Sequence, residues 1–127
     1  MNAGSPAATL ELSIPADPAL ALTARMFAGA VSRHLTADVS PDDLKLAFSE
    51  LLAAAIDAGA AEVVFRVDLE RQEVTVHGAG GSTATGEGLE DHDRFARSHR
   101  ADLLAALFPG ILIDVDTVTM PLRVAAE

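Results

Sequence analysis

Ser40–Ala58 reads S-P-D-D-L-K-L-A-F-S-E-L-L-A-A-A-I-D-A, and Glu62–Leu69 follows it as E-V-V-F-R-V-D-L. The first stretch predicts a helix over about 41–58, because it opens with a capping Ser, a Pro at the first helical position and two acids in the first turn. The second stretch is typical of a strand. Five apolar residues of the helix are expected to face the core: Leu44, Phe48, Leu51, Leu52 and Ala55.

The residues before this helix predict a strand and another helix. Thr9–Ile14, T-L-E-L-S-I, is apolar at alternate positions, as a half-buried strand is. Asp17-Pro18 supplies an N-cap and a first-turn Pro, so a helix is expected from there to about His34. Its buried side is expected to carry Leu22, Met26, Ala30 and Val31. The first eight residues are expected to form a disordered tail.

The residues after Glu62–Leu69 predict a hairpin, a glycine-rich loop and a final helix with two strands. Glu70-Arg71-Gln72 is short enough to turn the chain into a strand at Glu73–His77. The loop covers Gly78–Gly88, holds five of the nine glycines and is expected to be mobile. A further helix is expected over about 91–107, ending before Pro109-Gly110, with a break near Ser98 as an alternative. The chain is then expected to close with strands Ile111–Val115 and Val118–Val124.

The predicted order is β-α-α-β-β-loop-α-β-β, which indicates an α+β fold. We expect a two-layer α/β sandwich whose mixed, mostly antiparallel sheet carries its helices on one face. Residues 9–125 form a single domain in this interpretation, since 127 residues fit one domain.

Charge and composition exclude several function classes. Nine Lys and Arg against nineteen Asp and Glu give a net charge of -10, which disfavours direct contact with nucleic acid. The chain has no Cys, which removes thiol chemistry and disulfides and fits a reducing compartment. It has neither an apolar run of about 18 residues nor a signal peptide, so we expect a cytoplasmic protein without a membrane partner.

Two short features suggest a binding pocket. Glu50, Ala54 and Asp57 share one helix face, which is either one wall of a pocket, with Glu50 as a base, or an ordinary solvated surface. The stretch G-A-G-G-S begins at Gly78, where backbone N–H groups could cradle a phosphate or form a plain connection. Four scattered histidines have no metal-ligand spacing, so no metal site is predicted.

A positive stripe is the remaining feature. Arg94, Arg97 and Arg100 recur at every third position on the predicted final helix. They form either a docking patch for an acidic partner segment or an exposed face neutralised by nearby acids.

These segments together resemble the histidine-kinase-type (GHKL) ATP-binding fold, and more closely its small bacterial branch, the anti-sigma-factor serine-protein kinases. The resemblance covers about residues 9–125 and rests on L-E-L-S-I-P-A, S-P-D-D-L-K-L-A-F-S-E-L, L-L-A-A-L-F and V-T-M-P-L-R-V. It implies a nucleotide cleft beside the second helix, with Glu50 in place of the family's catalytic Glu. The implied remnant of that site comprises Glu50, Ala54, Asp57, Gly78, Gly80 and Gly81.

The chain departs from the family's pattern where the nucleotide would be held. Ala54 stands where the family has an Asn that helps to hold Mg²⁺, and Gly78 where it has an Asp that recognises adenine. Only Gly80 keeps its glycine, and Ser82 replaces the next one. Magnesium needs a full set of oxygen ligands, and phosphoryl transfer depends on its charge. Losing the Asp costs about 1.5–3 kcal/mol of base recognition.

The resemblance and its departures favour a regulatory protein-binding domain that engages a sigma factor or an anti-sigma antagonist. No cofactor is then needed, and weak binding of ATP with magnesium is an alternative. An active ATP-dependent serine-protein kinase with Glu50 as base is the second hypothesis. A homodimeric scaffold module of the same fold is the third.

Overall fold

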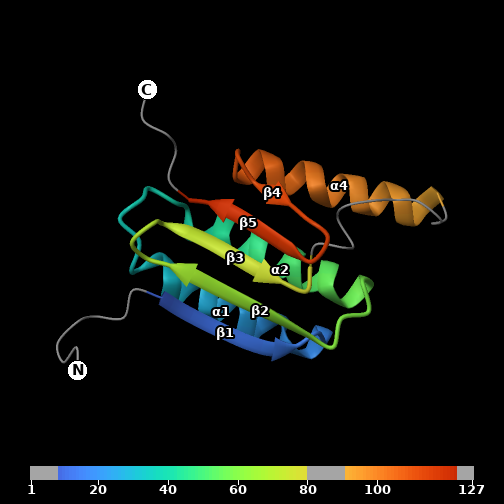
Figure 1. Cartoon of the computed structure of the whole chain (residues 1–127), viewed down its shortest axis with the longest axis horizontal. Helices are drawn as coiled ribbons and strands as arrows, with labels where there is room; N and C mark the ends of the chain where they lie inside the picture. Colours follow the sequence, from blue (N-terminus) through green and yellow to red (C-terminus); the bar gives the residue numbers. More distant parts are fainter. Residues whose placement is uncertain (1–8, 80–90, 123–127) are drawn as a thin grey trace.

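The computed structural model describes residues 9–79 and 91–122, and the side chains of 91–98 are outside the description. The predicted order of elements is confirmed, with one added 3₁₀ turn, η1 (Figure 1). The elements are β1 Thr9–Pro15, η1 Pro18–Leu20, α1 Ala21–Ser32, α2 Pro41–Asp57, β2 Glu62–Asp68, β3 Glu73–His77, α4 Asp91–Leu107, β4 Leu112–Ile113 and β5 Thr117–Pro121. The expected tail 1–8 lies outside the described residues.

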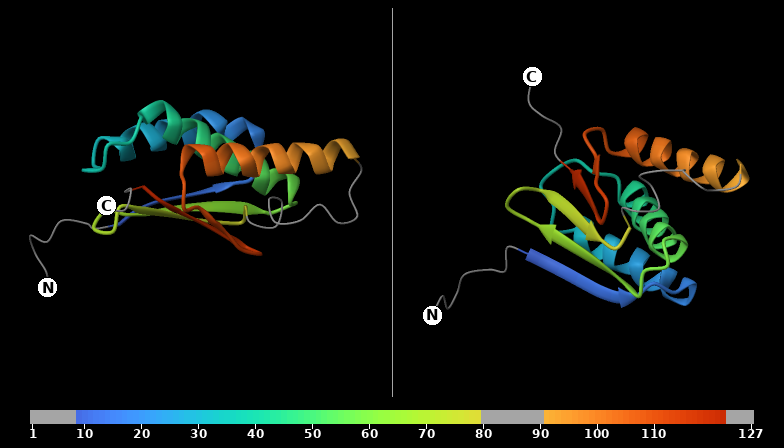
Figure 2. Two further views of the ribbon diagram at one scale, coloured as in Figure 1. Left: turned by 90° about the horizontal axis from the view of Figure 1, so that it is seen from above. Right: turned by 45° about the vertical axis from the view of Figure 1, so that its right-hand side comes forward.

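The two layers of the fold are a five-stranded sheet and a layer of helices. The strand order is β1-β2-β3-β5-β4, and every described pairing is antiparallel, so the sheet is antiparallel throughout rather than mixed. Figure 2 shows α1, α2 and α4 together on one face of that sheet. The predicted two-layer α+β fold is therefore confirmed. No helix in the described part of the chain is long and apolar enough to cross a membrane.

The core lies between α2 and the middle of the sheet. Strand pairing aligns Leu12, Phe65, Val76 and Val118 in one row across β1, β2, β3 and β5. Phe48 of α2 stacks on this row, with its ring centroid 4.7 Å from that of Phe65. All five residues predicted to face inward from α2 are buried. The local helix signals also hold, because Ser40 accepts a hydrogen bond from the backbone N–H of Asp43.

The predicted buried side of α1 is wrong for Leu22 and Met26, whereas Val31 is buried as predicted and Ala30 is half-buried. Leu22 and Met26 are 60% and 66% exposed, whereas Ala24, Ala28 and Val31 are fully buried. Most residues of this helix are apolar and they occur on both of its sides, so periodicity alone did not distinguish its two faces. Small residues face inward, and a helix whose inward face is small can approach its neighbours closely. The helix also starts at Ala21 after η1, rather than at Pro18, and it ends at Ser32 rather than His34.

The final third of the chain follows its prediction with shorter strands. Helix α4 runs without a break through Ser98 and ends before Pro109-Gly110, and Gly110 has a φ of +94°. The two closing strands pair as expected, although β4 has only two residues and β5 ends at Pro121. The expected glycine-rich loop lies outside the described residues from position 80 onward.

Gln72 forms a buried clamp that the sequence did not reveal. It is 2% exposed and has a φ of +53° at the end of the β2–β3 turn. Its side-chain Oε1 accepts hydrogen bonds from the backbone N–H groups of Thr36 and Ala37, at 3.0 and 2.9 Å. Its Nε2 donates to the carbonyl of Leu69, and its own carbonyl accepts from Leu122 N–H. One side chain therefore joins the hairpin turn to the connection between α1 and α2.

Candidate functional site

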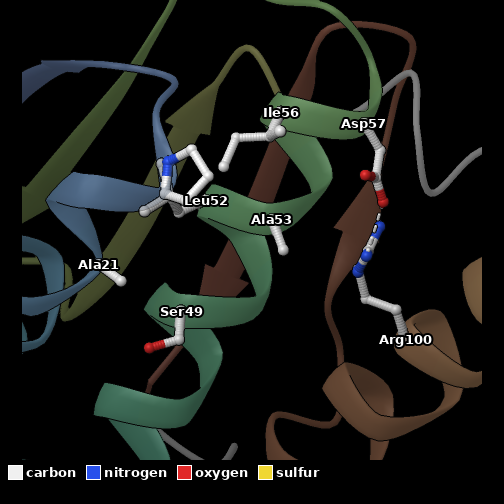
Figure 3. A pocket seen from close by; sticks show the side chains of 8 residues that line it. Ala21, Ser49, Leu52, Ala53, Ile56, Asp57 and Arg100 are labelled. Carbon is white, nitrogen blue, oxygen red and sulfur yellow. Dashed lines mark hydrogen bonds and ion pairs between the residues drawn. The ribbon is translucent and has the colours of Figure 1, made fainter.

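The candidate site lies where α4 crosses the end of α2. Arg100 of α4 is only 8% exposed, and its Nη2 donates a hydrogen bond of 2.9 Å to Oδ2 of Asp57. Its Nε lies 3.5 Å from Oε1 of Glu50, which makes an ion pair longer than most hydrogen bonds. Figure 3 shows the guanidinium reaching from α4 toward Asp57. The two carboxylates of α2 thus share one cation.

The expectation that Arg100 belongs to an exposed docking stripe is wrong. Its side chain points inward because Arg100 shares a helix face with Leu104, four residues later, which is fully buried. This apolar neighbour was a signal in the sequence that could have placed the arginine on the inner face. The side chains of Arg94 and Arg97 lie outside the described residues, so the rest of the stripe stays a prediction.

The predicted face of Glu50, Ala54 and Asp57 is not one open wall. The side chains of Glu50 and Asp57 are 31% and 51% exposed, but Ala54 is fully buried and belongs to the core. A longer side chain at 54 would have to enter packed space, at a cost typical of overfilled cores. The interpretation that this face is merely solvated is also wrong, because both carboxylates pair with Arg100.

Gly78 is required by the backbone and not by a ligand. Its φ is +102°, and a Cβ atom at this position would lie 2.6 Å from the carbonyl oxygen of Glu62. Its N–H donates a hydrogen bond of 2.9 Å to the carbonyl of Asp116, which joins β3 to the β4–β5 turn. That N–H is therefore already used and does not point to a phosphate. Gly80 and Gly81 lie outside the described residues.

An open hollow of about 330 Å³ lies beside the arginine pair. Its lining is mainly apolar and includes Leu52, Ala53 and Ile56 of α2, which Figure 3 shows with Ala21 of α1. The two charged side chains in the lining, Asp57 and Arg100, are paired with each other. Within 9–79 and 91–122, the buried Ser49 hydroxyl in this lining has no hydrogen-bond partner. No pattern in the sequence singled out that hydroxyl.

The group that the resemblance implies, a nucleotide with Mg²⁺, does not fit the residues that are present. A guanidinium sits between the two carboxylates, position 54 has no oxygen ligand, and position 78 has no room for a side chain. Among the described residues, no group of three or more His, Asp or Glu side chains is placed to hold a metal ion. We therefore derive no chemical step through a nucleotide.

The sequence matches no protein-family model and no curated protein.

Truncation of Arg100 is expected to cost stability without unfolding the domain. Arg100→Ala leaves Glu50 and Asp57 without their shared cation, and we expect the free energy of unfolding to fall by about 1–2 kcal/mol. The loss stays moderate because water screens both half-exposed carboxylates. Urea denaturation measures it. Arg66→Ala is the matched control, since Arg66 forms an exposed pair with Glu11 at 2.9 Å. An equal effect of both substitutions would contradict the buried role of Arg100.

Proposed function

We propose that this domain is a regulatory protein-binding module that works without nucleotide chemistry. The observation that carries the proposal is the bridge of Arg100 to Glu50 and Asp57. In a phosphoryl-transfer site the carboxylate wall needs to be open to a metal ion and to phosphate oxygens. Here the wall already holds a fixed cation. That cation forms an ion pair with Glu50, the residue that the kinase hypothesis would use as a base.

Two further positions support the same proposal. Position 54 is a fully buried Ala, which offers no oxygen to a metal ion. At position 78 the backbone conformation admits no side chain, so an adenine-recognising carboxylate has no place there. Both of these departures from the family's pattern are built into the packing around them. A single restored residue would therefore not recover a nucleotide site.

The resemblance suggests the partner: a sigma factor or an anti-sigma antagonist in the bacterial cytoplasm. A domain of this kind acts by covering the surface of its partner, so it needs a stable fold and an accessible patch. The helical layer can present such a patch, because α1 carries two exposed large apolar side chains.

Nucleotide titration tests the loss of chemistry. We expect isothermal titration calorimetry with millimolar Mg-ATP to give no binding heat for the wild-type protein. Arg100→Ala is the matched variant, because it removes the cation and leaves both carboxylates in place. Low-micromolar binding of Mg-ATP to the wild type would overturn the proposal and favour an active serine-protein kinase.

Reconstitution with partners tests the regulatory role. The sigma factors and antagonists of the native cell are purified and mixed with this protein, and complexes are detected by size-exclusion chromatography. A stoichiometric complex with one of them, formed without ATP, is the expected result. If none of them forms a complex, the regulatory proposal fails, whatever the titration gives.

A further inference from the structure

The outer side of α1 carries an apolar patch with two cations. Leu22, Arg25 and Met26 of α1 and Lys45 of α2 line a shallow hollow of about 180 Å³, and we call these four residues the α1–α2 patch. Leu22 and Met26 lie one helical turn apart and are 60% and 66% exposed. The two helices lie side by side in the helical layer (Figure 2). Exposed apolar side chains grouped in this way are typical of an interaction site.

The packing of the two helices holds Lys45 at the patch. A Cβ atom on Gly29 of α1 would lie 3.2 Å from Cε of Lys45, so the alkyl chain of the lysine lies over this glycine. Any larger residue at 29 would have to displace the lysine. Long cationic side chains commonly lay their methylene groups on apolar surface and keep the charge in water. The ammonium group thus stays beside the apolar pair.

The charge of the patch contrasts with that of the whole chain. The chain has a net charge of -10, but α1 contains no Asp or Glu at all. Neither Arg25 nor Lys45 forms an ion pair or a side-chain hydrogen bond with another residue of the described ranges. An acidic protein therefore presents two cations that its described acids do not neutralise, next to two exposed apolar side chains.

We propose that the α1–α2 patch docks an acidic amphipathic helix of a partner protein. Its apolar side would cover Leu22 and Met26, and its carboxylates would meet Arg25 and Lys45. This inference rests on the proposed protein-binding function and gives it a surface and a partner chemistry. Recognition of this kind places spaced apolar anchors in a groove and adds charge complementarity at the rim.

Two other occupants fit the charges less well. A second copy related by two-fold symmetry would bring the same patch onto itself, so that Arg25 and Lys45 would face like charges. An anionic membrane surface would repel a chain of net charge -10 as a whole. A short acidic helix would contact only the patch. The acidic remainder of the protein surface would therefore repel it less than it would repel a membrane or a second copy of the chain.

A defined peptide tests the proposal. The probe is a fluorescein-labelled synthetic helix with Leu on one side and Glu on the other, and its control is a scrambled peptide of equal composition without an apolar side. Fluorescence anisotropy should give a Kd on the order of tens to hundreds of micromolar, as expected for a small interface. The scrambled peptide should bind at least about tenfold more weakly. No binding of the amphipathic peptide, or equal binding of both peptides, would overturn the proposal.

Matched variants locate the interaction. Met26→Glu, and separately Arg25→Glu with Lys45→Glu, should each weaken peptide binding at least about tenfold. Val115→Glu is the control, because Val115 is 77% exposed and lies outside the patch. It adds the same charge as Met26→Glu and should change the Kd less than about twofold. Equal losses for Met26→Glu and Val115→Glu would contradict the assignment of the patch. Circular dichroism checks that each variant is folded.

The other occupants are outcomes of two more measurements. Sedimentation velocity that shows a dimer abolished by Met26→Glu would assign the patch to self-association and overturn the proposal. Cosedimentation with phosphatidylserine-containing vesicles that is lost in Met26→Glu would assign the patch to membrane binding and would also overturn the proposal. If a reconstituted natural partner binds the wild type and the patch variants equally, this inference fails and the proposed function stands. If no natural partner binds but the acidic peptide does, the proposed function fails and the assignment of the patch to an acidic helix stands.

Discussion

Gly78→Asp is expected to destabilise the domain by about 2–5 kcal/mol, although it restores the residue that the ATP-binding family has. A left-handed backbone costs a residue with a Cβ about 1–2 kcal/mol, and overfilling packed space adds about 1–3 kcal/mol. Both penalties apply here, because φ is +102° and the new Cβ would lie 2.6 Å from the carbonyl oxygen of Glu62. Urea denaturation followed by circular dichroism measures the loss.

Gly59→Ala separates the two penalties. Gly59 also has a positive φ, +75°, but a Cβ there would meet nothing within 4 Å. This control should cost only about 1 kcal/mol, the conformational part alone. If Gly78→Asp costs no more than Gly59→Ala, the close approach of the backbone at 78 is wrong. Position 78 would then have room for a carboxylate that recognises adenine.

Gln72→Ala is expected to lower the free energy of unfolding by about 2–3 kcal/mol. The substitution removes the acceptor for the N–H groups of Thr36 and Ala37 and the donor to the carbonyl of Leu69. Partly buried donors that lose their partner cost about 1–3 kcal/mol. The loss falls on the connection between α1 and α2, and so on the helix pair that forms the α1–α2 patch.

Glu70→Ala tests whether that cost belongs to the amide of Gln72 or to the turn as a whole. Glu70 lies in the same turn, its side chain is exposed, and only its backbone N–H bonds to Asp68. We expect a change below about 0.5 kcal/mol, the range of ordinary surface substitutions. A similar loss in Glu70→Ala and Gln72→Ala would contradict the clamp. Thermal unfolding of both variants beside the wild type decides between the two outcomes.

Part of the candidate site was predictable and part was not. Helical spacing placed Glu50 and Asp57 on one side of α2, and the structure brings both to one guanidinium. The arginine between them comes from a helix about fifty residues away in sequence, so no local pattern could pair it with either acid. The spacing between Arg100 and the apolar Leu104 could have predicted that Arg100 points inward. Nothing in the sequence predicted which acids it would pair with.

The sequence by itself determined the elements whose signals are local. The cap at Ser40, the first-turn Pro and acids, the apolar spacing of α2 and the alternation in β1 act within a few residues, so they predicted the order and the two-layer fold correctly. The tertiary structure alone decided which side of α1 is buried, what fills the space beside Gly78 and where Gln72 binds. These features depend on close packing between segments far apart in the chain. A helix with apolar residues on both sides, such as α1, carries no local signal that tells which side is buried.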